Sequence, residues 1–67
     1  MAARPTTSER YMTVGEADRR IAQLRATMDP RSTSGRWVYH VPATGQWITA
    51  QREGGIFRLD FFGECPC

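Results

Sequence analysis

Lysine and asparagine are both absent from this chain, although nine of its 67 residues are arginine. Both missing residues use AT-rich codons, so their absence indicates a GC-rich genome, and we expect a bacterial or phage origin. Selection of arginine for paired contacts to phosphate or carboxylate is the alternative, but the arginines are scattered. With seven acidic residues the net charge is only +2, unlike the concentrated basic patch of a dedicated nucleic-acid-binding protein.

Long hydrophobic runs are also missing. No segment approaches the roughly 18 apolar residues of a membrane helix, and residues 1–10 lack the apolar core of a signal peptide. We therefore expect a cytoplasmic protein with no membrane contact. The two cysteines, Cys65 and Cys67, are separated by one proline. A disulfide between them would close a very small ring, so we expect no disulfide framework.

Catalytic and metal-binding patterns are lacking as well. His40 is the single histidine, and no serine or cysteine is expected beside it with a carboxylate behind, as a nucleophilic triad requires. Structural zinc sites use two close-spaced ligand pairs, and the second pair is missing here. We therefore expect no enzyme activity, no cofactor and no metal.

The chain divides into three segments by composition. Residues 1–10 are polar and are interpreted as a flexible tail, residues 11–62 as one domain, and residues 63–67 as a C-terminal tail. A domain of this size has a barely sufficient core, which good packing or formation of a homodimer would compensate.

A helix is predicted from residue 13 onward. Thr13 and Glu16 have the spacing of a capping box, and an apolar stripe follows at spacings of three and four. Pro30 disfavours helical geometry in the residue before it, so the helix should end near Met28 or Asp29. The stripe consists of Val14, Ala17, Ile21, Leu24 and Met28.

Three strands are predicted at Arg36–Val41, Gln46–Gln51 and Ile56–Phe62, because apolar and polar residues alternate there and turn residues separate the segments. A two-residue or a four-residue first turn gives the same assignment of faces. One face carries Trp37, Tyr39, Val41, Ile48, Ala50, Phe57, Leu59 and Phe61.

Together these elements predict an α+β fold of two layers, in which one N-terminal helix packs on a three-stranded antiparallel β-meander in the order αβββ. The helix stripe should cover the face with most of the aromatic residues.

The opposite face is then left open. The predicted register places Trp47 opposite Phe62, Thr49 opposite Asp60, and Gln51 opposite Arg58. Large exposed aromatic residues either stiffen a sheet through cross-strand pairs or mark a contact surface. The residues that we expect to bind a partner are Trp47, Phe62, Arg58, His40 and Gln51.

The function expected from this surface is protein–protein contact, by an adaptor, an assembly component, an inhibitor or a homodimer, because tryptophan and arginine are enriched among interface anchors. A nucleic-acid-binding regulator is the alternative, with bases stacked on the aromatic rings and arginine meeting phosphate. A structural subunit of a larger assembly is a further alternative. No small-molecule substrate is expected.

Overall fold

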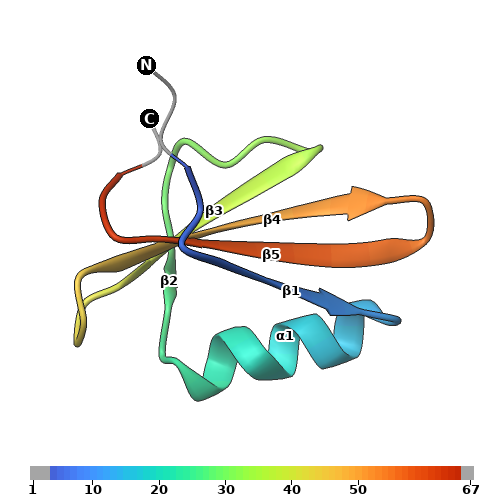
Figure 1. Ribbon diagram of the computed structural model, residues 1–67, viewed down its shortest axis with the longest axis horizontal. Coiled ribbons are helices and arrows are strands. Elements are labelled where there is room, and N and C mark those ends of the chain that lie inside the picture. The colour runs from blue at the N-terminus through green and yellow to red at the C-terminus, as the bar shows by residue number, and fades with distance from the viewer. Residues whose placement is uncertain (1–3, 66–67) are drawn as a thin grey trace.

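The three strands predicted from the alternating pattern form the centre of the sheet (Figure 1). They are β3 (Arg36–Val41), β4 (Gln46–Glu53) and β5 (Ile56–Phe62) in a computed structural model that describes residues 4–65. Gly54 and Gly55 both have positive φ, at 58° and 84°, as the tight turn between β4 and β5 requires. The predicted pairs of Trp47 with Phe62, Thr49 with Asp60 and Gln51 with Arg58 are confirmed.

The predicted three-stranded αβββ fold is nevertheless wrong, because two further strands extend the meander. They are β1 (Thr7–Tyr11) and β2 (Thr27–Met28), and the antiparallel sheet has the order β1-β5-β4-β3-β2. Strand β1 lies largely in the segment predicted to be a flexible tail. Its sequence has one large apolar residue, Tyr11, so no alternating pattern reveals it. The pairing depends instead on backbone groups that the edge of β5 leaves available.

Helix α1 (Val14–Gln23) begins as predicted and ends early. The Thr13 hydroxyl accepts a hydrogen bond from the backbone N–H of Glu16 at 3.2 Å, which confirms the predicted cap. The predicted end at Met28 or Asp29 is wrong, because the chain reverses at Arg25, where φ is 54°.

The early helix end is a Schellman motif. The N–H of Arg25 donates to the carbonyl of Ala22 at 3.0 Å, and the N–H of Ala26 donates to the carbonyl of Ile21 at 3.3 Å. These two bonds satisfy carbonyls that the helix end would leave unpaired. The turn frees residues 27 and 28 to pair with β3.

The core lies between α1 and the sheet. Ile48 and Leu59 are fully buried, and Ala17 and Ile21 of the helix complete the layer. Figure 1 shows α1 running beneath β1 and β5, the two strands that it contacts most. The helix therefore lies closest to the β1 and β5 side of the sheet.

Two expectations concern the ends of the chain and the membrane. Cys65 is not a free thiol, and Cys67 lies outside the described residues, so the prediction for the pair is not tested. Within residues 4–65, no helix is long and apolar enough to cross a membrane.

Candidate functional site

A cavity of about 280 Å³ opens between α1 and the strands of the sheet. We call it the helix-side groove. Helix residues form one wall, and β2, β3, β4 and β5 supply the other wall and the floor. Its lining consists of Val14, Ala17, Asp18, Ile21, Met28, Trp37, Tyr39, Ala50 and Phe57.

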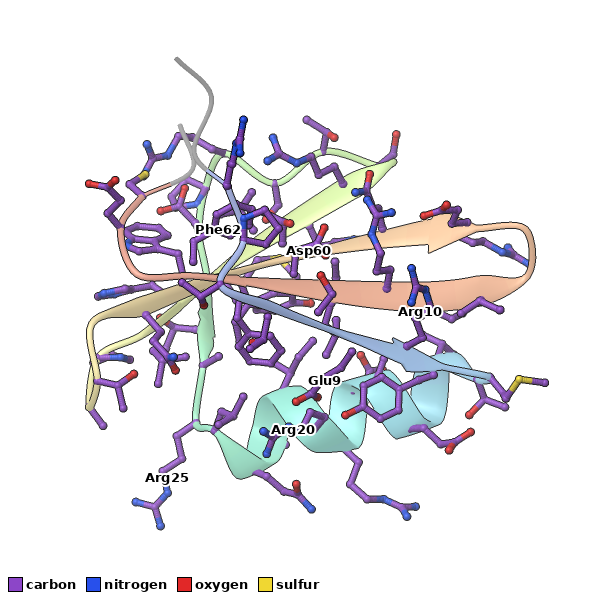
Figure 2. The ribbon with its side chains drawn as sticks, viewed as in Figure 1. Glu9, Arg10, Arg20, Arg25, Asp60 and Phe62 are labelled. Atoms are coloured by element: carbon purple, nitrogen blue, oxygen red, sulfur yellow. The ribbon has the colours of Figure 1, made fainter. Side chains whose placement is uncertain are left out.

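The helix lies to one side of the sheet because polar contacts hold it against β1. Arg20 of α1 donates from Nε to the Glu9 carboxylate at 3.0 Å and from Nη2 at 3.3 Å. Figure 2 shows these two side chains between strand and helix. The Tyr11 hydroxyl donates to the same carboxylate. These bonds join α1 to the β1 edge of the sheet.

Apolar groups line the groove and reach solvent. Met28 is 57% exposed and Val14 is 53% exposed, although the sequence pattern placed both in the helix stripe that covers the core. Met28 lies in β2 rather than α1, and Val14 lies in the first turn of the helix. Exposed apolar side chains beside a concave site are typical of binding surfaces.

Three aromatic residues contribute to the groove wall. Trp37, Tyr39 and Phe57 are each half-buried. The guanidinium carbon of Arg52 lies 5.8 Å from the centre of the Phe57 ring, within the range of a cation–π contact. Arg52 is paired with Phe57 in the register of β4 and β5, so this cation lies on the groove side of the sheet.

Asp18 brings a negative charge to the groove. Its side chain is exposed, and among the described residues it has no ion pair. Burial raises the pKa of Tyr39 above its ordinary value, and the charge of Asp18 raises it further. The carboxylate therefore acts on the groove interior, where nothing of opposite charge neutralises it within the described part of the chain.

The face predicted to be open is in large part covered. Val38, Thr49, Asp60 and Phe62 are all buried there, and Trp47 and His40 are half-buried. The rings of His40 and Trp47 stack with centroids 4.5 Å apart. The guanidinium of Arg31, from the loop between β2 and β3, lies 5.4 Å from the centre of the Trp47 ring.

Arg58 has a structural role on this face. Its Nε donates to the buried Asp60 carboxylate at 3.2 Å, and its Nη1 donates to Glu53 at 2.6 Å. The Ser8 hydroxyl donates to the other oxygen of Asp60 at 2.6 Å. Asp60 and Phe62 both lie on the side of the sheet away from α1 (Figure 2). Phe62, at 5% exposed, offers little surface to a partner.

The remaining predicted residues form a row across the sheet. Register places Arg10 opposite Arg58, Arg58 opposite Gln51, and Gln51 opposite Arg36. The structure therefore brings Gln51 and Arg58 together and separates them along the strands from Trp47, His40 and Phe62. Arg10 joins the row from β1, and sequence reasoning missed it because β1 was not predicted.

Sequence reasoning also missed the helix-side groove. Its aromatic residues were assigned to the correct face, but a longer helix was expected to cover them. No group of three histidine, cysteine or carboxylate side chains lies together among residues 4–65, as a metal site needs.

Comparison with known proteins adds no relationship to this description. No protein-family model, curated protein or solved structure matches the chain.

Proposed function

We propose that this chain is a non-enzymatic binding protein that recognises a partner protein through the helix-side groove. The observation that supports this proposal is the concave surface beside α1, where the half-buried Trp37 and Tyr39 lie together with the exposed Met28. Aromatic residues and methionine are enriched in protein interfaces.

The size of the groove favours a side chain of a partner over a free metabolite. Its volume of about 280 Å³ falls at the lower limit of small-molecule pockets, which span about 300–1,000 Å³. The ionisable groups among its lining residues are Asp18 and Tyr39, which do not form a nucleophile–base pair. A groove of this volume can hold one or two anchoring side chains from the surface of a partner protein.

Photocrosslinking in the producing cells tests the proposal. A benzoylphenylalanine at position 28 should capture a partner, because Met28 lines the groove and is exposed. The matched control is position 12, since Met12 is 75% exposed and does not line the groove. Trp37→Ala should remove the crosslink at position 28 while the domain stays folded. Equal capture from both positions, or capture that survives Trp37→Ala, would refute the groove as the binding site.

Nucleic-acid binding by the second face is a second candidate, supported by the exposed Arg10 and Arg36, which lie in one row across the sheet on either side of the ion-paired Arg58. Arginine side chains in such a row would contact successive phosphates. Binding to single-stranded oligonucleotides should then weaken steeply with added salt, and Arg10→Gln with Arg36→Gln should reduce both affinity and salt dependence. Absence of binding at low salt would exclude this candidate.

A further inference from the structure

The groove combines aromatic rings with an uncompensated negative charge. Trp37, Tyr39 and Phe57 contribute the rings, and Asp18 contributes the carboxylate. Within the described residues no arginine forms an ion pair with Asp18. An apolar side chain in the groove would contact the aromatic rings but form no ion pair with Asp18. A cation would interact with both the rings and the carboxylate.

Aromatic rings attract cations because the face of each ring carries negative electrostatic potential. The chain already shows this interaction on the groove side of the sheet, where the guanidinium of Arg52 lies 5.8 Å from the Phe57 ring centre. Indole is the strongest of the three ring types in this respect. Trp37 and Tyr39 have no recorded cation contact among residues 4–65.

We propose that the occupant of the helix-side groove is an alkylammonium side chain of the partner protein, held against Trp37 and Tyr39 with Asp18 as its counter-charge. This inference rests on the proposed function and specifies the chemistry of the anchor. The exposed apolar side chains of Met28 and Val14 can contact the aliphatic stem of such a side chain. The carboxylate of Asp18 can pair with its charged head.

The charges around the groove fix where the cation lies. Arg52 contacts the Phe57 ring and would repel a second cation there. Asp18 and Tyr39 both line the groove, and the charge of Asp18 raises the pKa of Tyr39 in addition to burial, so the favourable potential lies at the Tyr39 end. The alkylammonium head is therefore placed between Asp18 and Tyr39, away from Arg52.

A pair of isosteric probes tests the requirement for positive charge. Choline and 3,3-dimethyl-1-butanol have nearly the same shape and differ by the charge of the quaternary centre. Titration of the full chain with each, followed in amide and indole NMR spectra, should show choline shifting the Trp37 indole and Ala50 amide signals. We expect choline to bind about 2–5-fold more tightly than the neutral probe, as an exposed cation–π site implies.

Three substitutions test the role of charge in the groove. Asp18→Asn should remove the preference for choline over the neutral probe. Glu64→Gln removes the same charge at another exposed position and should preserve the preference. Arg52→Gln should strengthen choline binding, because it removes the competing cation from the Phe57 end.

The outcomes distinguish this inference from the proposed function. Equal binding of the two probes, no binding of choline, or a preference that persists in Asp18→Asn overturns the cation site. In each of these cases the groove can still be a protein-binding site. That would be so if a partner crosslinks at position 28 and the crosslink disappears in Trp37→Ala. If both proposals hold, choline should reduce the crosslink at position 28 and the neutral alcohol should reduce it less.

Discussion

At the scale of single residues, the buried carboxylate of Asp60 shows how the second face of the sheet is stabilised. Asp60 is 6% exposed, and its two oxygens accept hydrogen bonds from Ser8 and Arg58. Among the described residues no buried side-chain polar atom lacks a partner. Arg58 was predicted from the sequence to meet a partner protein, and in the structure it neutralises a charge of its own chain.

Arg58→Met should therefore destabilise the fold by about 1–3 kcal/mol, because Asp60 loses a charged hydrogen-bond donor while the aliphatic part of the side chain is kept. Arg36→Met is the matched control, since Arg36 lies in the same row, is exposed and has no recorded ion pair among residues 4–65. Urea unfolding of both variants measures the difference. Equal losses of stability would mean that Asp60 does not depend on Arg58.

Glu9 makes stability depend on pH. Burial raises the pKa of Glu9, but the hydrogen bonds from Tyr11 and Arg20 and the positive charge of Arg20 outweigh burial, so the pKa lies below its ordinary value of 4.5. A carboxyl group with a lowered pKa in the folded state contributes stability above its unfolded pKa, and that contribution is lost as pH falls through the folded pKa.

Glu9→Gln should reduce stability at neutral pH by at most about 1 kcal/mol, since the Glu9 and Arg20 side chains are both about one-third exposed and solvent screens the pair. The difference from the unmodified chain should shrink as pH falls below 4.5. Thermal unfolding across this range, with Glu64→Gln as the charge control, measures the effect. A difference that stays constant with pH would contradict a role for the ionised carboxylate.

At the scale of elements, the end of α1 depends on a residue in an unfavourable conformation. Arg25 has φ of 54°, where residues other than glycine are strained. Its side chain is exposed and points away from the helix in Figure 2. The bonds of Arg25 and Ala26 to carbonyls of the last helical turn hold this conformation.

Arg25→Gly should consequently stabilise the protein by up to about 1 kcal/mol, because glycine adopts the required φ without a Cβ clash. Arg19→Gly, on the exposed side of the same helix, should have the opposite effect and cost about 1 kcal/mol. Chemical denaturation compares the two. If both variants were destabilised alike, the helix would not end at this turn in solution.

Deletion of strand β1 is the clearest test of the five-stranded sheet against a three-stranded fold. Removal of residues 1–10 should abolish cooperative unfolding, because β1 borders β5 along its whole length and Glu9 joins the sheet to α1. Removal of residues 1–5 is the control and should leave a cooperative transition. A truncated chain that melts as sharply as the full chain would show that β1 adds little.

The sequence predicts some of these elements and not others for physical reasons. Strands β3, β4 and β5 are predicted because buried aromatic and β-branched residues alternate with polar residues, and Gly54 and Gly55 mark their turn. Strand β2 has only two residues, both exposed, so it shows no alternating pattern. The turn before it is formed by Arg25, and arginine is not a residue type that indicates a left-handed turn. Pro30, five residues beyond Arg25, is therefore the stop signal that the sequence offers.

The expected length of the helix also determined which residues the sequence offers as a candidate site. A helix continuing to Met28 would have covered Trp37 and Tyr39, which left Trp47 and Phe62 as the available aromatic residues. Their faces and register were predicted correctly, because side chains alternate strictly across a strand. What covers each face depends on tertiary contacts, such as Arg31 over Trp47, that no local pattern contains.

At the scale of the whole molecule, a short helix held against β1 leaves a groove beside it on the same face of the sheet. Figure 1 shows α1 beneath β1, and β2 forms the opposite edge of the sheet. The resulting groove joins residues from positions 14 to 57 in the chain. Partner recognition in this groove is the central proposal, and the chain carries one tryptophan on each face of the sheet with which to test it.

The most direct measurement is therefore the affinity of the crosslinked partner, once purified, for Trp37→Ala and for Trp47→Ala, with calorimetric melting used to confirm that both variants are folded. We predict that Trp37→Ala weakens binding by at least about tenfold, as loss of an aromatic anchor implies, while Trp47→Ala changes it little. The reverse order would contradict the groove and return the binding site to the second face of the sheet.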